Sequence, residues 1–245
     1  MPKGFTKNIG HFFSKGISNF RGGFLAYHPD AYTTFGDHQE FSGLFEKFRK
    51  HNRRNNGGDI ARLWSLVLNI KQVIKENVGG DFAEVGVWRG NTAAVLAYFA
   101  EQYGRNAFLF DTYEGFHEQD LRGIDAGQGS SFSDTSLDRV REVVGIDSDR
   151  IHFVKGWFPD SAIEQHKERK YAVVSLDCDL YAPMKAGLDF FYPRLSEGGI
   201  LFLHDYSSQY WIGAAKAIDE WAELSGEKII LMPDKSGSAF VRKTK

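Results

Sequence analysis

The sequence contains a single cysteine, Cys178, among its 245 residues, so no disulfide can form within the chain. Such cysteine usage fits a reducing compartment. Apolar runs are also short, and none approaches the roughly 20 residues needed to cross a bilayer. Gly10, His11 and Lys15 interrupt any secretory apolar segment near the start. We therefore expect a soluble, cytoplasmic protein without a transmembrane segment.

An excess of charge of either sign is missing as well. Lys and Arg total 30 against 32 Asp and Glu, which gives a net charge of -2. A nucleic-acid-binding protein normally carries a basic footprint, and this sequence has none. With 42% hydrophobic and 15% aromatic residues, the chain has ample material for a buried core. The composition favours a small-molecule or glycan partner and no nucleic acid.

The first 36 residues differ from the rest, because phenylalanines there alternate with glycines and basic residues. Phe13, Ile17, Phe20 and Phe24 have helical spacing and predict one apolar stripe. Packing on the main domain or on a second subunit would cover this stripe, and a helix lying on a membrane surface is the alternative. We expect a homo-oligomer, an N-terminal arm and helical extension over residues 1–58, and a main domain over residues 59–245.

A clear α/β pattern begins at Asp59. Apolar residues from Ile60 to Ile74 repeat with helical period, and Gly79-Gly80 ends that helix. Apolar runs then alternate with helical segments, which predicts a seven-stranded, mostly parallel Rossmann-like sheet with helices on both faces. The last two runs flank a turn at 233–237 and predict a C-terminal antiparallel hairpin. The predicted strands lie near 82–87, 107–111, 151–155, 171–176, 199–203, 228–232 and 238–242.

Acidic residues stand near the ends of several of these strands. Glu84, Asp111, Asp177 and Asp205 each occupy such a position. In an open α/β sheet, ligands bind outside the carboxyl ends of the strands, so these carboxylates would surround one crevice. The arrangement indicates an enzyme.

The turn after the first strand contains Gly86 and Gly90, and an apolar helix opens at about Thr92. Glycines permit a sharp turn and close approach to a ligand, and a helix N-terminus offers free N–H groups to a nucleotide-like cofactor. The spacing Gly-x-x-x-Gly is not the Gly-x-Gly-x-x-Gly of dinucleotide sites. A tight βα turn without a ligand is the alternative interpretation.

Two further strand ends fit the same crevice. Asp111 stands where doubly wound folds hydrogen-bond a ribose, although it would also cap the loop at 112–115. Gly156, Trp157 and Phe158 follow the third strand, and their rings would either flank a flat base or belong to the core.

Asp177 and Asp205 end the fourth and fifth runs. Neighbouring parallel strands lie about 4.8 Å apart, so the two carboxylates can share one ion. Oxygen ligands suit Mg²⁺, whereas the nitrogen of His204 favours Zn²⁺, Mn²⁺ or Fe²⁺. Each residue here also has a structural explanation. Asp179 would begin the next helix, whose first turn would contain Pro183, and His204 would be a hydrogen-bonded structural histidine.

A long polar, glycine-containing segment spans residues 117–135. A loop of this length over the carboxyl edge of a sheet is commonly functional, and here it predicts a lid. Ser136 with Asp138 then indicates the start of another helix.

Six ordered motifs resemble the macrocin O-methyltransferase family, whose members are S-adenosylmethionine-dependent enzymes of the class I fold. They lie at 82–90, 111–116, 154–159, 176–183, 191–195 and 204–206, within a resemblance over about residues 59–243. Where the family often has two aspartates at the fifth strand end, this sequence has His204 and then Asp205. The resemblance implies a methionine site at Glu84, Gly86 and Gly90, a ribose site at Asp111, an adenine site near Gly156 and Trp157, a base and metal ligand at Asp177, and a second ligand at Asp205.

We therefore expect methyl transfer from S-adenosylmethionine to a hydroxyl of a sugar or of a glycosylated natural product. The expected machinery is an Asp177 base with His204, and a divalent metal, Mg²⁺ or Mn²⁺, held by Asp177, His204 and Asp205. Asp177 and His204 acting as a metal-free pair is the alternative for the chemistry. Two other functions remain as rivals, a nucleotide-dependent oxidoreductase and a non-catalytic S-adenosylmethionine-binding module.

Overall fold

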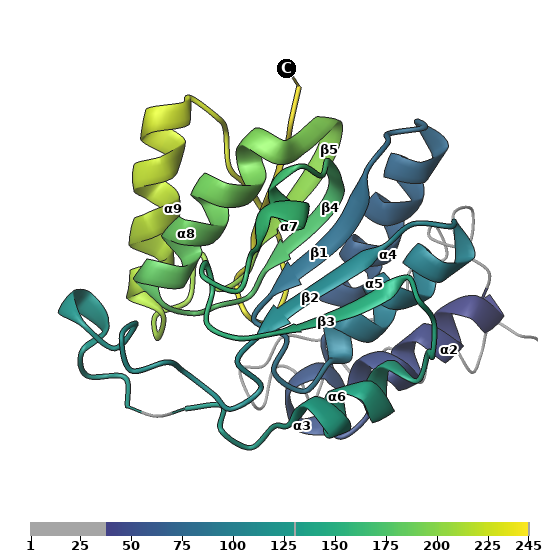
Figure 1. The fold of residues 1–245 in the computed structure, drawn as a ribbon, viewed down its shortest axis with the longest axis horizontal. Helices are drawn as coiled ribbons and strands as arrows, with labels where there is room; N and C mark the ends of the chain where they lie inside the picture. The colour runs from purple at the N-terminus through teal and green to yellow at the C-terminus, as the bar shows by residue number, and fades with distance from the viewer. Residues whose placement is uncertain (1–37, 130, 245) are drawn as a thin grey trace, which may run out of the picture.

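A seven-stranded sheet forms the centre of the computed structural model, which describes residues 38–129 and 131–244 (Figure 1). The strand order is β3-β2-β1-β4-β5-β7-β6, with the first five strands parallel and β7 antiparallel to both β5 and β6. The predicted fold class is confirmed. The strands are β1 (Asp81–Val85), β2 (Ala107–Asp111), β3 (Ile151–Lys155), β4 (Tyr171–Leu176), β5 (Leu195–Leu203), β6 (Ile230–Leu231) and β7 (Ala239–Arg242).

Helices cover both faces of the sheet (Figure 1). One apolar core lies between the sheet and α2, α4, α5 and α6, and the other lies between the sheet and α8 and α9. The central strands β1, β2 and β4 are almost wholly buried, which explains their continuous apolar sequences. The helices are α2 (His38–Arg49), α3 (Arg53–Asn56), α4 (Ile60–Lys75), α5 (Asn91–Gln102), α6 (Leu137–Val144), α7 (Glu164–Lys167), α8 (Tyr181–Phe191) and α9 (Ile212–Ser225), with short 3₁₀ turns at Gly123–Asp125 and Tyr192–Arg194.

Local capping fixes where several helices begin. Asp59 accepts a hydrogen bond from the N–H of Arg62 at the start of α4, and Ser136 accepts one from the N–H of Arg139 at the start of α6. The predicted start at Ser136 is thus confirmed. Asp179 does not start a helix as the sequence suggested, because α8 begins at Tyr181 after the extended residue Leu180. Asp179 is left free for another role.

The described part of the N-terminal extension packs directly on the sheet domain. Phe41 of α2 stacks on Trp64 of α4 with ring centroids 3.9 Å apart. Asn56 of α3 donates a hydrogen bond to the carbonyl of Phe48, and Lys47 donates one to the carbonyl of Val144 at the end of α6. The predicted stripe of Phe13, Ile17, Phe20 and Phe24 lies outside the described residues.

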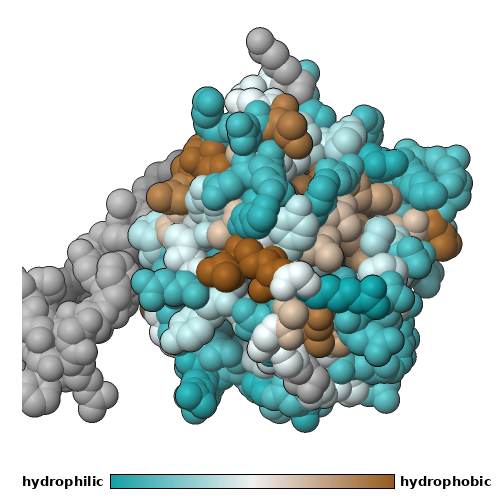
Figure 2. Space-filling model, turned by 90° about the vertical axis from the view of Figure 1, so that its left-hand side faces the viewer, coloured by the Kyte–Doolittle hydropathy of each residue, from teal (hydrophilic) through white to brown (hydrophobic). Residues whose placement is uncertain are grey.

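The surface beside the carboxyl edge is mainly hydrophilic. Figure 2 looks onto the side that carries α8, α9 and the loop before α6, where apolar residues form separate small patches. Within the described part of the chain, no helix combines the length and apolar character required to span a membrane.

Candidate active site

A cavity of about 610 Å³ opens at the carboxyl edge of the sheet. This volume lies in the range of small-molecule sites. It brings together most of the residues singled out in the sequence, whereas Gly90 and His204 are absent from its described lining. The predicted residues that line it are Glu84, Gly86, Thr92, Asp111, Gly156, Trp157, Asp177 and Asp205.

The two glycines of the β1–α5 turn have different surroundings. Gly86 has φ +85°, and a β-carbon there would lie 2.0 Å from the carbonyl oxygen of Asp177. Glycine at this position lets the ends of β1 and β4 approach each other at the cavity wall. Gly90 has φ +81° and packs against Val140 of α6, so its contacts are structural.

Glu84 is a buried carboxylate on β1. Its Oε2 atom has no hydrogen-bond partner among the described residues, and the side chain is 1% exposed. Burial, and then the negative charge of Asp177, raise the pKa of Glu84 well above its usual value. An unpaired buried acceptor that lines a cavity suits a ligand with a cationic or N–H group.

Asp111 organises the turn in front of it. Its Oδ2 accepts hydrogen bonds from the N–H groups of Val87 (2.6 Å) and Trp88 (2.9 Å), while Oδ1 accepts one from Tyr113 (2.5 Å). Burial raises the pKa of Asp111, although these backbone donors lower it. The carboxylate therefore ties β2 to the β1–α5 turn, and it also faces the cavity.

Trp157 is held in place by the loop at 117–129. Its indole N–H donates to Oδ2 of Asp120 at 2.9 Å, and the His117 ring stacks on it with centroids 5.1 Å apart. The loop thus extends across the β3 end of the cavity, where a flat ring of a ligand could stack on Trp157.

A second aromatic wall was not predicted from the sequence. Phe132 contacts three rings at centroid distances of 5.0 Å to Trp88, 5.1 Å to Phe116 and 5.8 Å to Trp211. All four rings line the cavity. They come from three connections, β1–α5, β2–α6 and β5–α9, so no spacing in the sequence could have grouped them.

Three carboxylates meet at the ends of β4 and β5. Asp177, Asp179 and Asp205 each offer an oxygen, and these atoms lie within 4.8 Å of one another. Burial, and then the neighbouring carboxylates, raise the pKa of Asp205 to about 8 and that of Asp179 well above its usual value. Hard oxygen ligands that repel one another fit a divalent cation such as Mg²⁺ or Mn²⁺, which would relieve the repulsion.

His204 lies beside this group rather than within it. Its Nε2 contacts Ser175 Oγ at 3.0 Å and its Nδ1 contacts Ser238 Oγ at 3.2 Å, while Nδ1 lies 3.9 Å from Asp177 Oδ2. Burial lowers the pKa of His204. Asp179, and not His204, groups with Asp177 and Asp205, although the sequence analysis named His204 as the third metal ligand. The reason is that His204 still continues the β5 ladder with Leu176, whereas Asp179 and Asp205 leave their strands with φ +59°.

Arg62 is a further residue that the sequence analysis missed. It extends from α4 into the cavity, and its Nη2 lies 3.7 Å from Asp177 Oδ2. The sequence could have indicated this, because Arg62 lies one helical turn before Leu66 and therefore on the buried face of α4.

The strand order, the antiparallel end of the sheet and the cavity at its carboxyl edge define a Rossmann-like methyltransferase fold. Among solved structures, the O-methyltransferase NovP superposes with a TM-score of 0.71 at 21% identity, covering 84% of this chain and 99% of that chain. This likeness concerns the fold.

The chain belongs to the macrocin O-methyltransferase (TylF) family, whose model matches residues 58–239. A tetracenomycin rhamnoside 4'-O-methyltransferase of Streptomyces olivaceus is 30% identical over 160 residues, which are 60% of this chain and 61% of that protein. The mycinamicin III 3''-O-methyltransferase of Micromonospora griseorubida is 28% identical over 161 residues, 60% of this chain and 63% of its own length. The matched region thus spans about three fifths of these curated relatives.

Proposed function

We propose that this protein transfers the methyl group of S-adenosylmethionine to a hydroxyl of a sugar or a glycosylated natural product. The observation that carries the proposal is one cavity with two differently equipped ends. The β1–β3 end has a buried carboxylate oxygen without a partner among the described residues, together with aromatic walls, and the β4–β5 end has three clustered carboxylates. Membership in the family, and the named activities of the relatives, support the same activity.

At the cofactor end, Glu84 would accept hydrogen bonds from the ammonium group of the methionine part. The turn at Gly86 and the start of α5 near Thr92 would lie against that part, with Gly90 acting through the shape of the turn. Asp111, which faces the cavity, would accept the ribose hydroxyls. Trp157, next to Gly156, would flank the adenine.

At the reacting end, Asp177 would accept the proton of the acceptor hydroxyl. The transfer forms an oxygen–methyl bond and breaks a sulfur–methyl bond, leaving S-adenosylhomocysteine. General-base assistance of this kind typically contributes about 10²–10⁴-fold. His204 would act as a positioning residue, since its ring lies 3.9 Å from the Asp177 carboxylate.

A divalent metal would be held by Asp177, Asp179 and Asp205. When bound, it would polarise the acceptor hydroxyl and lower its pKa.

The lining beyond the acidic group favours a carbohydrate acceptor. Asn52 and Asn55 of the α3 region face the cavity, as do Ser207, Ser208 and Gln209 after β5. The Oδ1 atom of Asn52 is buried without a hydrogen-bond partner among the described residues. Amide and hydroxyl groups of this density can pair with several sugar hydroxyls at once.

The decisive test is a transfer assay with methyl-labelled S-adenosylmethionine across glycosides, nucleotide sugars and catechols. We expect label in a glycoside, and we expect Asp177→Asn to lower kcat by at least about 100-fold with cofactor affinity kept within threefold. Asp189→Asn, an exposed change on α8, is the matched control. Full activity of Asp177→Asn would remove that residue from the chemistry.

The two rival functions predict different outcomes in transfer and binding measurements. Binding of S-adenosylmethionine without transfer to any acceptor would favour a non-catalytic binding module. Binding of a nicotinamide dinucleotide in its place, measured by calorimetry, would favour an oxidoreductase.

A further inference from the structure

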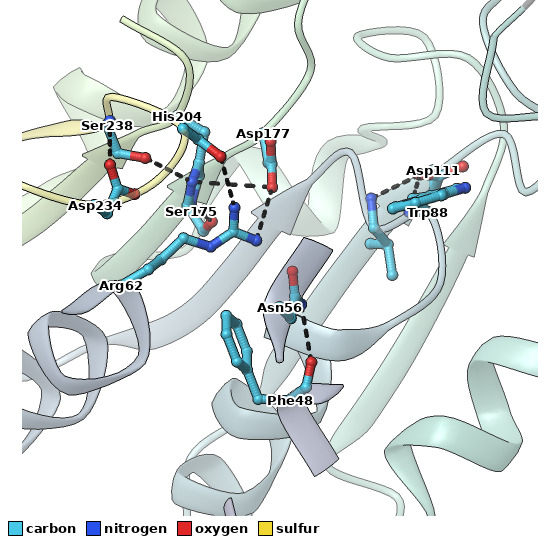
Figure 3. A network of polar contacts seen from close by, with 12 residues as sticks. Phe48, Asn56, Arg62, Trp88, Asp111, Ser175, Asp177, His204, Asp234 and Ser238 are labelled. Atoms are coloured by element: carbon cyan, nitrogen blue, oxygen red, sulfur yellow. Dashed lines mark hydrogen bonds and ion pairs between the residues drawn. The ribbon is translucent and has the colours of Figure 1, made fainter. Parts of the chain in front are cut away.

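The guanidinium of Arg62 is held on three sides. Nη2 faces Asp177 Oδ2 at 3.7 Å, and the carbon Cζ lies 5.4 Å from the centre of the Phe48 ring (Figure 3). Nη1 donates a hydrogen bond to Ser236 Oγ at 3.5 Å. Ser236 belongs to the β6–β7 turn and Phe48 to α2. Three separate elements therefore fix one cationic side chain beside the proposed base.

The same guanidinium lies among several carboxylates. Burial by itself would lower the pKa of Arg62, but Asp177, Asp59, Asp234 and Asp205 raise it. Arg62 is therefore a permanent positive charge, and its side chain is only 13% exposed. Screening by water is weak at such a position.

Two side chains restrain the Asp177 carboxylate. Arg62 and the His204 ring both approach Oδ2 of Asp177, at 3.7 and 3.9 Å. Asp177 also belongs to the acidic group with Asp179 and Asp205. It is thus the carboxylate shared between the arginine and the candidate metal site.

We propose that Arg62 is a positioning residue that restrains the Asp177 carboxylate and, as a fixed positive charge, limits how tightly the acidic group binds a divalent cation. This inference rests on the proposed metal site. It predicts that loss of Arg62 strengthens metal binding while it slows turnover. Without the positive charge, the guanidinium no longer repels the cation. Without the planar guanidinium, the Asp177 carboxylate is no longer held in one orientation. Damage to the fold alone would weaken metal binding and turnover together.

The test is calorimetric titration of the full chain with MnCl₂ alone, followed by steady-state kinetics with the best acceptor. For Arg62→Gln we expect Mn²⁺ affinity to rise at least tenfold while kcat falls at least tenfold. Arg62→Lys keeps the charge without the planar fork, so its Mn²⁺ affinity should stay within threefold of wild type while kcat falls at least fivefold. Arg54→Gln removes a charge from an exposed position on α3 and should change neither quantity.

An unchanged or weaker Mn²⁺ affinity in a folded Arg62→Gln variant would overturn the inference. Should Arg62→Gln not fold, as judged by its thermal transition, Arg62→Lys decides, and an unchanged kcat in that variant would overturn it. The proposed metal site has a separate check, because Asp179→Asn must lose Mn²⁺ binding. Equal binding by Asp179→Asn and wild type would refute the site itself, and the role of Arg62 with it.

Discussion

The Cα atom of Gly86 packs against the carbonyl of Asp177, so closely that a β-carbon would lie 2.0 Å from the carbonyl oxygen. The contact joins the end of β1, which carries the proposed cofactor residues, to the end of β4, which carries the proposed base. The two halves of the cavity therefore depend on one residue without a side chain.

Gly86→Ala should destabilise the protein by roughly 3 kcal/mol or more, measured as the free energy of unfolding in urea. Positive φ alone costs alanine about 1–2 kcal/mol, and the backbone clash adds to it. Gly104→Ala is the matched control, because Gly104 has φ +63° but open space around it. Equal losses in the two variants would mean that the Asp177 contact is unimportant.

Glu84→Gln should stabilise the unliganded protein at high pH and weaken cofactor binding. The pKa of Glu84 is raised in the folded state, so the native protein binds more protons than the unfolded chain above the ordinary value of 4.5. Its contribution to stability is therefore largest at low pH and declines as pH rises from that value toward the folded pKa. Glutamine cannot ionise and escapes this decline.

The measurement is urea unfolding of both proteins at pH 5 and pH 8. We expect the stability advantage of Glu84→Gln over wild type to be larger at pH 8 than at pH 5, because the pKa of Glu84 is raised in the folded state. Calorimetry should show at least a tenfold loss of S-adenosylmethionine affinity. If the difference in unfolding free energy between Glu84→Gln and wild type is the same at both pH values, the stability prediction is wrong. If the affinity for S-adenosylmethionine is unchanged, the binding prediction is wrong.

The ligands of the proposed metal site can be tested residue by residue. Since both ring nitrogens of His204 contact serine hydroxyls, His204→Gln should keep Mn²⁺ affinity within about threefold. Asp179→Asn and Asp205→Asn should each lower it at least about tenfold, as expected when a charged oxygen ligand is lost. Exhaustive chelation should abolish methyl transfer by wild type, with recovery on adding Mg²⁺ or Mn²⁺. Strong loss of Mn²⁺ binding in His204→Gln would restore the ligand set expected from the sequence.

The loop before α6 is anchored by Asp125, which is fully buried. Its Oδ2 accepts a hydrogen bond from the N–H of Tyr181 at 2.7 Å, and a β-carbon on Gly213 would lie 2.3 Å from its Oδ1. The carboxylate thus packs against the first turns of both α8 and α9. Helix N-termini favour a negative charge at such a position.

Gly213→Ala should displace Asp125, cost about 1–3 kcal/mol as overpacking does, and speed proteolytic cleavage within 117–129. Because both changes break the same contact, Gly213→Ala should add little in the background of Asp125→Ala. Gly127→Ala, in the same loop with open space around it, is the control. Full additivity of the two changes, measured by urea unfolding, would show that they act independently.

Much of the fold could be predicted because its signals are local. Buried parallel strands produce continuous apolar runs, and a capping residue such as Ser136 marks a helix start within one turn of its own position. The cavity residues Glu84, Asp111 and Asp177 follow from the same logic, since parallel strands bring their carboxyl ends to one edge. The direction in which a side chain points beyond the end of its strand cannot be predicted from these local signals. That limit explains why the sequence did not show that Asp179, and not His204, lies together with Asp177 and Asp205.

The sequence by itself therefore determined the seven strands, the glycine turn and the edge at which the carboxylates gather, because each depends on residues close together in the chain. Only the tertiary structure decided which groups meet there. Positive φ at Asp179 and Asp205 turns both carboxylates toward Asp177, while the strand register leaves His204 between Ser175 and Ser238. Arg62 reaches the same point from α4, although it lies 115 positions before Asp177 in the chain. Contacts across such separations depend on how the helices pack on the sheet, and no spacing in the sequence specifies that.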